Sequence, residues 1–433
     1  MCYNYLCEHL FAMRFYSKRE GEGKMDRTIL HCDLNNFYAS VACRDHPELR
    51  NRAVAVTGSE EQRHGIVLAK NMAAKKCGVQ TGETIRDAKL KCPDLVCVPP
   101  DFPRYNHFSR LARQIYEQYS DMVEPFGPDE AWIDVSGSRV LFGNGEKIAN
   151  EIRNRIKREL GLTISVGVSF NKVFAKLGSD LKKPDAVSVI SRENFRDVVW
   201  PLPVESMIGI GRSTKQKLNS MGIYTLGELS VANTDGLKRT LGVLGPQMQE
   251  NARGNDLSRV AAATYSRVPQ SLGRSTTYHV DICTYADVWR VMLKLAEDVG
   301  MQLRSHKLEA TGVQIHLRTN QLKVNELQAP LRRPTSSGLV LCEEGFDLFR
   351  RNYQFLYPLR SLGIRAINLK PQADNASQIY LFENVTDSVK RQKIDEEMDS
   401  LKSRFGKDCI CRGAVLGEPD PKGQEKPFSM MYK

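Results

Sequence analysis

Three carboxylates stand at the ends of short apolar segments, where their side chains could reach a common point. Asp33 directly follows segment 28–32, a β-branched and apolar run that is typical of a strand. Asp129 and Glu130 follow the turn 125–128 and open another predicted strand. Neighbouring residues of a regular strand point to opposite faces, so both acids reach one site only where the strand is irregular. The Gly-Pro step of the turn supplies that irregularity.

Carboxylates in such an arrangement suit a hard divalent cation. Mg²⁺ binds one or two carboxylates together with substrate phosphates. Two such ions about 3.5–4 Å apart clamp the attacking and leaving oxygens of a phosphoryl displacement. The same residues are also compatible with unrelated solvated acids and a helix cap, and their spacing alone does not separate the two interpretations.

The elements that must position these acids follow from short-range periodicity. Short β-branched or apolar runs bounded by turn residues predict strands, and apolar residues at three- and four-residue spacing predict amphipathic helices. The predicted strands are 28–32, 53–56, 65–69, 131–135 and 163–168, and the predicted helices are 105–119 and 148–160. Strands interleaved with helices indicate an α/β or α+β core to about residue 190.

Beyond this core the chain changes character. Residues 200–258 contain short predicted helices punctuated by glycines, whereas 265–370 alternates strand, helix and strand. Residues 371–433 are polar, and an apolar stripe predicts one amphipathic helix at 394–405. Residues 1–24 have no periodicity, and we treat them as an extension outside the fold.

The composition favours an anionic partner. Lys and Arg number 62 against 51 Asp and Glu, a net charge of +11, which is typical of nucleic-acid binding but also fits a generic basic surface. The 11 cysteines form no Cys-x-x-Cys pair, which excludes a zinc ribbon and indicates reduced thiols. No apolar run approaches the roughly 20 residues of a membrane helix, and the start lacks a signal-peptide pattern. We therefore expect a soluble, cytoplasmic protein without a membrane partner.

Three ordered motifs resemble those of the Y-family DNA polymerases, which carry out translesion synthesis. The first is 33–41, the second is 128–134, and the third combines 166–176 with 182–184. Their order and separations fit the family, and the resemblance covers nearly the whole chain, from about residue 26 to 369. Each motif alone is a weak signal, whereas the three in order are highly specific.

The resemblance implies an α+β multidomain fold, a right-hand polymerase with a ferredoxin-like palm. It also implies small fingers, a helical thumb with a helix-hairpin-helix and an α/β little finger. The expected domains are an extension at 1–25, the palm at 26–36 and 101–190, the fingers at 37–100, the thumb at 191–258, the little finger at 265–370, and a tail at 371–433.

The resemblance also implies roles for the acids. Asp33 and Asp129 would bridge two Mg²⁺ ions, the carbonyl oxygen of Leu34 would bind the nucleotide-side ion, and Glu130 would complete the primer-side ion. The primer-side ion lowers the pKa of the primer 3′-hydroxyl, and the other neutralises charge on the departing pyrophosphate. The implied function is template-directed, error-prone transfer of nucleotides from dNTPs to a DNA primer.

The sugar and the triphosphate have their own expected contacts. Tyr38 aligns with the steric gate of the family, a ring that leaves no room for a 2′-hydroxyl, and Phe37 beside it is expected to bind substrate. Lys75 and Lys183 are the expected phosphate partners. The family usually has Asn-Tyr-x-Ala-Arg-Lys where this chain has Met72 in the tyrosine position and Lys75 in the arginine position. Lysine supplies a point charge without the bidentate fork of arginine, so triphosphate binding departs from the family pattern.

DNA binding without sequence readout is expected from two regions. Gly209 and Gly211 resemble a helix-hairpin-helix, in which backbone N–H groups at a helix start bind a phosphate, although a Gly-x-Gly step could be an ordinary turn. Basic residues of the little finger would follow DNA phosphates and position the duplex, although any one of them could be a solvated surface charge. The residues singled out are Arg274, Arg332, Arg333, Arg360 and Arg365.

The tail holds a segment that resembles the sliding-clamp peptide of bacterial polymerases. In 378–382, Leu381 and Phe382 would fill an apolar pocket on the clamp, and Gln378 would hydrogen-bond beside it. The alternative is a small strand that docks on its own domain. The expected partners are thus primer-template DNA, dNTP and the sliding clamp, with a chain that is itself monomeric.

Two other functions fit parts of the sequence. One is an inactive relative that acts as a DNA-binding scaffold; the three carboxylates argue against it, and Met72 and Lys75 favour it. The other is a ferredoxin-like nucleotidyl cyclase, which would need neither the helix-hairpin-helix nor the basic third region. Primer extension tests the first, and reaction of nucleoside triphosphate without DNA tests the second.

Overall fold

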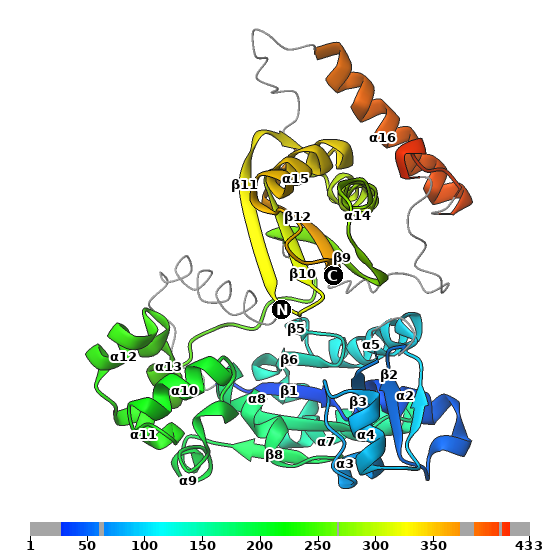
Figure 1. Cartoon of the computed structure of the whole chain (residues 1–433). Helices are drawn as coiled ribbons and strands as arrows, with labels where there is room; N and C mark the ends of the chain where they lie inside the picture. Colours follow the sequence, from blue (N-terminus) through cyan, green and yellow to red (C-terminus); the bar gives the residue numbers. More distant parts are fainter. Residues whose placement is uncertain (1–26, 60–64, 266–267, 373–384, 407–408, 416–433) are drawn as a thin grey trace. The chain divides into compact units, whose positions relative to one another are not determined.

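The computed structural model describes residues 27–59, 65–265, 268–372, 385–406 and 409–415 (Figure 1). The chain divides into two compact units: one contains the residues up to Tyr265 apart from the segment Gly58–Ile66, and the other contains those from Ser266 onward. The expected extension at 1–25 and the clamp-like segment 378–382 lie outside the described residues.

A five-stranded sheet forms the centre of the first unit. Its order is β5-β6-β1-β7-β8. The central strand β1 runs antiparallel to both β6 and β7, and β7 runs parallel to β8. The strands are β1 (Ile29–Leu34), β5 (Val123–Phe126), β6 (Glu130–Asp134), β7 (Ile164–Ser169) and β8 (Val187–Ile190). The strands expected at 28–32, 131–135 and 163–168 are therefore present, with ends shifted by a residue or two.

Alternation along β1 separates two faces of this sheet. Leu30, Cys32 and Leu34 join the apolar core that also contains residues of α5 (Phe102–Glu117) and α7 (Gly145–Arg155). The intervening side chains, Asp33 among them, face α8 (Lys172–Leu181). Helices α5 and α7 correspond to the amphipathic helices expected at 105–119 and 148–160. A π-helical turn, Ile156–Leu160, follows α7 directly. Short turns at Ser136–Ser138 and α6 (Arg139–Phe142) precede α7.

Helix α8 lies unusually close to the sheet because two glycines face each other. A Cβ atom on Gly167 of β7 would lie 1.9 Å from the carbonyl oxygen of Ala175, and one on Gly178 would lie 3.1 Å from Cα of Gly167. Any larger side chain at Gly167 would push the helix away. The close approach lets polar side chains of α8 reach the central strand.

A smaller three-stranded sheet forms the region predicted as the fingers. Its order is β3-β2-β4, with β2 antiparallel to β3 and parallel to β4. Its elements are α2 (Phe37–Asp45), the turn Pro47–Leu49, β2 (Val54–Thr57), β3 (Val67–Lys70), α3 (Met72–Lys76), α4 (Ile85–Lys91) and β4 (Val96–Val98).

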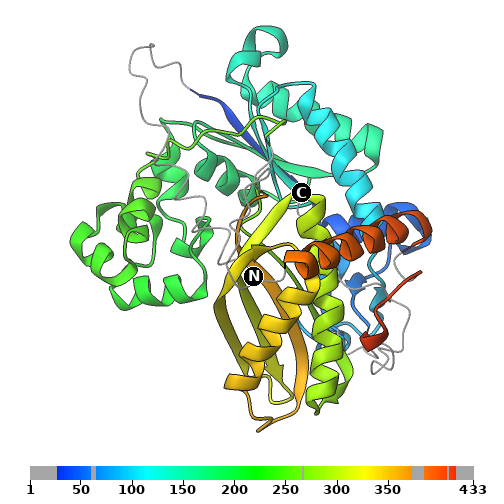
Figure 2. The same cartoon turned by 90° about the horizontal axis from the view of Figure 1, so that it is seen from above.

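Short helices lie between residues 195 and 252, as the glycine-punctuated pattern predicts, and their apolar core is shared with Phe174 and Leu177 of α8 and Ile190 of β8. Figures 1 and 2 show them as a separate green bundle within the first unit. They are α9 (Phe195–Val199), the turn Val204–Ser206, α10 (Arg212–Ser220), α11 (Leu226–Val231), α12 (Thr234–Leu241) and α13 (Leu244–Ala252).

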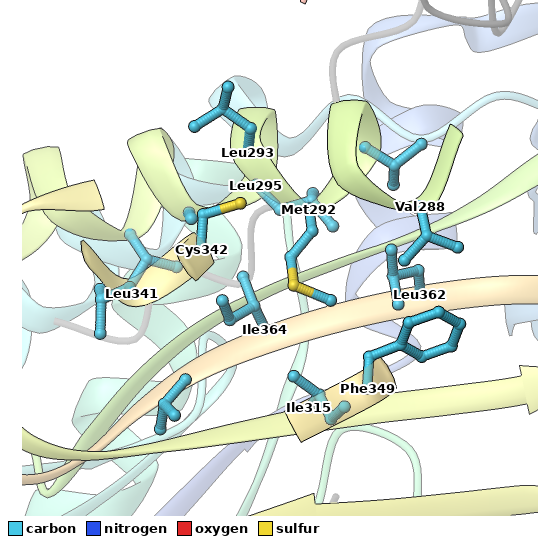
Figure 3. Packing of buried hydrophobic residues seen from close by; sticks show 14 of the residues in the cluster. Val288, Met292, Leu293, Leu295, Ile315, Leu341, Cys342, Phe349, Leu362 and Ile364 are labelled. Carbon is cyan, nitrogen blue, oxygen red and sulfur yellow. The ribbon is translucent and has the colours of Figure 1, made fainter. Parts of the chain in front are cut away.

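The second unit is a four-stranded sheet with helices on one face. The order is β11-β10-β12-β9, and every neighbouring pair is antiparallel. Its elements are β9 (Ser271–Ile282), α14 (Tyr285–Ser305), β10 (Leu308–Thr319), β11 (Val324–Thr335), α15 (Gly338–Asn352) and β12 (Leu359–Pro371). Figure 3 shows how Met292 of α14 and Phe349 of α15 pack against Ile315 and Ile364 of the strands.

The last described helix, α16 (Val385–Phe405), corrects one expectation. The apolar stripe predicted from 394–405 is not buried, because Ile394 and Phe405 are 49% and 65% exposed. The helix is instead held to α14 by charge: Nε of Arg304 lies 2.6 Å from Asp399, and Asp395, only 5% exposed, lies 3.5 Å from Arg304. A short turn, Gly413–Val415, follows.

None of the helices within the described ranges combines the length and apolar character that a membrane span requires.

Candidate active site

The sheet register brings two of the predicted carboxylates side by side. Asp33 of β1 pairs with Glu130 of β6, and cross-strand partners share a face. That face carries α8, whose Lys176 places its Nζ 2.9 Å from Oε2 of Glu130 and 3.6 Å from Oδ2 of Asp33. The acids expected from distant parts of the chain therefore converge on one lysine.

The third acid, Asp129, lies just before β6 begins and so stands outside the regular strand. Its carbonyl oxygen accepts the N–H of Leu34 at 3.0 Å, which ties it to the end of β1. The turn before it contains Gly127 at φ 82°, a left-handed conformation that favours glycine. The irregularity expected at this turn is present, and it lets Asp129 and Glu130 approach the same place.

Mutual repulsion marks the three acids as one electrostatic unit. Burial, followed by the charges of Glu130 and Asp33, raises the pKa of Asp129 to about 7. Burial also opposes ionisation of Glu130, but its contacts with His31 and Lys176 lower its pKa to about 2. Glu130 is thus held ionised by His31 and Lys176, whereas Asp129 resists ionisation.

Two lysines supply positive charge at this place. Nζ of Lys183 lies 2.7 Å from Oδ2 of Asp33 and 2.8 Å from Oδ1 of Asp180. Burial opposes protonation of both lysines, but the carboxylates of Asp33 and Asp180 raise the pKa of Lys183, and those of Glu130, Asp180 and Asp33 raise that of Lys176. Both ammonium groups are therefore firmly charged.

The carboxylate oxygens at this place are of the kind that binds a hard divalent cation, although the side chains of Asp33 and Glu130 contact the lysines. In the described part of the chain, no three His, Cys, Asp or Glu side chains are arranged ready to hold a metal ion. Burial first, and then the charges of Glu130 and Asp33, raise the pKa of Asp129, so its carboxylate would gain from a cation beside it. Carboxylate oxygens with uncompensated charge are what Mg²⁺ prefers, so the residues fit the predicted ions.

The predicted sugar contact is held by aromatic packing. The ring of Tyr38 stacks on Tyr105 at a centroid distance of 4.1 Å and an interplanar angle of 10°. It also meets Phe102 edge-on at 6.1 Å. Phe37 is buried in the core shared with α5. Tyr38 thus has a defined ring orientation, whereas Phe37 contributes mainly to packing.

The two predicted phosphate partners lie in different surroundings. Lys183 contacts Asp33 directly, as described above. Lys75 is exposed in the last turn of α3. That helix starts at Asn71, whose side chain accepts the N–H of Ala74 and that of Val54. Asn71 therefore fixes α3 against β2, independently of the departures at Met72 and Lys75.

The predicted hairpin in the helical bundle has the expected backbone. Gly209 adopts φ 97°, and Gly211 precedes α10 as its N-cap without a side-chain hydrogen bond. Met207 and Ile210 are buried in the apolar core of the helical bundle and so hold the hairpin in place. The first N–H groups of α10 are consequently not capped by a side chain, which suits binding of a phosphate.

The predicted arginines of the second unit do not share one face. Arg365 pairs with Gln314 and Gly273 on the face of the sheet without helices. Arg274 instead pairs with Ile364, which is buried under the helices, so Arg274 lies on the other face of the sheet. Arg332 has a side chain 90% exposed. Arg333 and Arg360 are partly buried.

Sequence reasoning missed three residues that the structure places at the carboxylates. They are His31, Lys176 and Asp180. His31 could have been found from the period of two along β1, which puts it on the same face as Asp33. The lysine and aspartate could not, because their proximity depends on how α8 packs on the sheet.

Comparison with known proteins agrees with this arrangement. Residues 32–180 match the impB/mucB/samB family, 269–381 match the C-terminal domain of that family, and 192–223 match its HHH motif. The DNA polymerase IV of Acetivibrio thermocellus is 50% identical over 395 residues, which cover 90% of this chain and 98% of that relative. DNA polymerase IV 1 of Bacillus subtilis is 33% identical over 407 residues, covering 93% and 96%.

The fold is also found among solved structures. A Y-family DNA polymerase chimera superposes with a TM-score of 0.70 at 22% identity, covering 79% of this chain and 99% of the chimera. The expected α+β architecture with a helix-hairpin-helix is thereby confirmed.

The electrostatics predict how stability depends on pH when metal is absent. The folded-state pKa of Asp129, about 7, exceeds its ordinary value of 3.8, so ionisation destabilises the folded state increasingly between those values and fully above them. Asp129→Asn should therefore stabilise the chelator-treated protein at pH 8, by on the order of 2–4 kcal/mol relative to its effect at pH 4. Urea unfolding at both pH values measures this difference. Asp134→Asn, at the far end of β6, is the control, and an Asp129→Asn effect equal at both pH values would contradict the assignment.

Proposed function

Because this chain belongs to the impB/mucB/samB family of Y-family DNA polymerases, we propose that Asp33, Asp129 and Glu130 hold two Mg²⁺ ions for nucleotidyl transfer. The chain is a DNA-directed DNA polymerase of the translesion type, with primer-template DNA and dNTP as its substrates. The family depends on divalent metal ions in general. The identity of the ion and the residues that hold it are the proposal.

The observation that carries this assignment is the register of β1 and β6, which places Asp33 beside Glu130, with Asp129 tied to the end of β1 through the N–H of Leu34. Buried acids repel one another unless positive charge lies between them. Bound divalent ions would supply Lewis-acid chemistry, lowering the pKa of the primer 3′-hydroxyl and neutralising the pyrophosphate. The carbonyl of Leu34, at the end of β1 next to Asp33, is the proposed additional ligand on the nucleotide side.

Two lysines are the proposed contacts of the triphosphate. Lys183 lies between Asp33 and Asp180, so its ammonium can turn toward a triphosphate without leaving the carboxylates. Lys75, exposed on α3, is the second proposed phosphate partner. As a point charge it orients a phosphate less strictly than arginine would. Nucleotide affinity is therefore expected to depend more on Lys183.

Sugar selection is assigned to Tyr38. Its ring is held by the stack with Tyr105 and the edge contact with Phe102, so it cannot swing aside freely to admit a larger sugar. Phe37 supports it from the buried side of α2.

We assign the domains of the right hand to the ranges expected from the sequence. The palm, at 26–36 and 101–190, contains the five-stranded sheet, and the fingers, at 37–100, contain the three-stranded sheet. The thumb at 191–258 contains the hairpin at Gly209 and Gly211, and the little finger at 265–370 contains the four-stranded sheet. Arg365 on its open face and the exposed Arg332 are the proposed phosphate contacts of the little finger.

The tail is assigned to a protein partner. We infer that Gln378, Leu381 and Phe382 bind a sliding clamp, and that the chain works as a monomer. The support for this is the order of a Gln followed by Leu-Phe in the sequence. The rival function, an inactive scaffold, has no support among the comparisons, and all three acids of the site are present.

Asp129→Asn tests the metal assignment. The variant should fold but lose primer extension with Mg²⁺ by on the order of 10²–10³-fold, because several kcal/mol of transition-state stabilisation depend on the ions. Extension of a labelled primer measures the rate. Asp134→Asn should extend at the parental rate, and near-parental extension by Asp129→Asn would remove the assignment.

Tyr38→Ala tests sugar selection. Without the ring, the 2′-hydroxyl meets no obstacle, and the preference for dNTP over rNTP should fall by about 10–200-fold. Single-nucleotide incorporation with each sugar gives the ratio of kcat/KM. Tyr38→Phe keeps the ring and should keep the preference. An unchanged ratio in Tyr38→Ala would refute the role.

Deletion of 378–382 tests the clamp assignment. The basal extension rate should remain within about two-fold of the parent, since the segment is not proposed to contact DNA or nucleotide, whereas stimulation by the clamp should disappear. Primer extension with and without clamp on long templates measures both quantities. Alanines at Asp374 and Asn375 form the matched control. Persistent clamp stimulation after the deletion would exclude the segment.

A further inference from the structure

His31 is a fully buried side chain inside the catalytic face that the proposed reaction does not yet use. It lies on β1 two residues before Asp33, with 0% of its surface exposed. Its Nδ1 lies 2.8 Å from Oγ of Ser179 on α8, and its Nε2 lies 3.2 Å from Oε2 of Glu130. The ring thus links the helix behind the sheet to an acid of the site.

Packing fixes where this ring lies. Its edge meets Trp132 at a centroid distance of 5.2 Å, and the indole N–H of Trp132 in turn donates to the carbonyl of Lys172 at 3.0 Å. The close approach of α8 at Gly167 brings Ser179 within reach of the ring. His31 therefore has neither space nor solvent to adopt another orientation.

The donors and acceptors around the ring determine whether the nitrogen that faces Glu130 carries a proton. An ionised carboxylate only accepts, so a favourable contact requires a proton on Nε2. Nδ1 can then accept from the hydroxyl of Ser179. If that hydroxyl instead donates to the carbonyl of Lys176 at 2.7 Å, Nδ1 must donate as well, which requires the doubly protonated ring that burial disfavours by lowering the pKa of His31. The remaining tautomer sets two lone pairs against each other at 3.2 Å. The neutral ring therefore contacts Glu130 favourably only with its proton on Nε2.

The contacts of Glu130 are one-sided. His31 and Lys176 both approach Oε2, and in the described part of the chain Oε1 makes no hydrogen bond or ion pair. At 3.2 Å the Nε2–Oε2 contact does not meet the geometry of a hydrogen bond in this structure, and catalytic hydrogen bonds are often long or poorly aligned before substrate binds. Holding Oε2 from two directions aims Oε1 away from the protein interior.

We propose that His31 is a positioning residue that orients Glu130 for the primer-side ion. The proposal rests on the proposed function, which makes Glu130 a metal ligand. Partners that hydrogen-bond a metal ligand fix its direction, and their loss typically costs 10–100-fold in metal affinity or activity.

Three substitutions separate orientation from packing. His31→Gln can place an amide N–H near the position of Nε2 and so keep a donor for Glu130. His31→Asn can reach only as far as the position of Nδ1 and keeps a partner for Ser179 alone. His31→Leu keeps volume but neither contact. The Gln and Asn variants differ in which neighbour they can hydrogen-bond, Glu130 or Ser179. A purely structural role of His31 therefore predicts no higher metal affinity for the Gln variant than for the Asn variant.

Binding of Mn²⁺ to the free enzyme, followed by electron paramagnetic resonance, is the readout that needs no turnover. His31→Leu and His31→Asn should weaken Mn²⁺ binding by about 10–100-fold, and His31→Gln should restore it to within a few-fold. The Mg²⁺ concentration for half-maximal extension should shift in the same order, while KM for dNTP stays near parental. Urea unfolding reports the stability of each variant. Parental Mn²⁺ affinity in His31→Leu, or equal affinities in the Gln and Asn variants, would overturn the proposal.

Glu130→Gln distinguishes a failure of the His31 proposal from a failure of the proposed metal-binding role of Glu130. If Glu130→Gln loses Mn²⁺ affinity while His31→Leu does not, only the role of His31 fails. If Glu130→Gln binds Mn²⁺ and extends primers like the parent, the metal assignment of Glu130 itself fails.

Discussion

Mutual repulsion among Asp33, Asp129 and Glu130 is the constraint around which the catalytic face is built. Buried carboxylates are costly unless cations or N–H donors lie beside them. The protein meets this need with Lys176 and Lys183, yet the pKa of Asp129 remains near 7, so the compensation is incomplete. Incomplete compensation is what the proposed metal role requires, because carboxylates that the protein neutralised fully would have little affinity left for metal ions.

A rigid scaffold is what allows the acids to stay close despite this repulsion. Strand β1 is central in its sheet, hydrogen-bonded to β6 on one side and to β7 on the other, so Asp33 cannot move without disturbing two ladders. Helix α8 covers the same face at a distance set by Gly167 and Gly178. The lysines and Ser179 arrive on that helix, which makes helix–sheet packing and site electrostatics parts of a single arrangement.

Charge also organises the second unit. Asp395 joins α16 to the second unit through Arg304, and a hydroxyl of Ser337 donates to the same carboxylate at 2.8 Å. Buried polar groups with several partners specify one docking geometry more strictly than an apolar stripe would. On α3, by contrast, Lys75 is exposed where the resemblance implies an arginine, which leaves Asp33 and Lys183 as the better-defined part of the proposed nucleotide site.

From the amino-acid sequence alone, periodicity and motif order determined the strands that carry Asp33 and Glu130, the irregular turn before Asp129, the position of Tyr38 and the class of fold. These follow from local preferences, since a strand's alternation and a turn's Gly-Pro step act over a few residues. Tertiary structure alone decided that His31 contacts Glu130, that Lys176 joins two acids, and that Arg274 pairs with buried Ile364. It also decided that Asp395 of α16 is buried against Arg304, while Ile394 and Phe405 of the same helix stay exposed. Register between strands and the approach of a helix to a sheet depend on contacts between residues far apart in the chain, and periodicity carries no information about those distances.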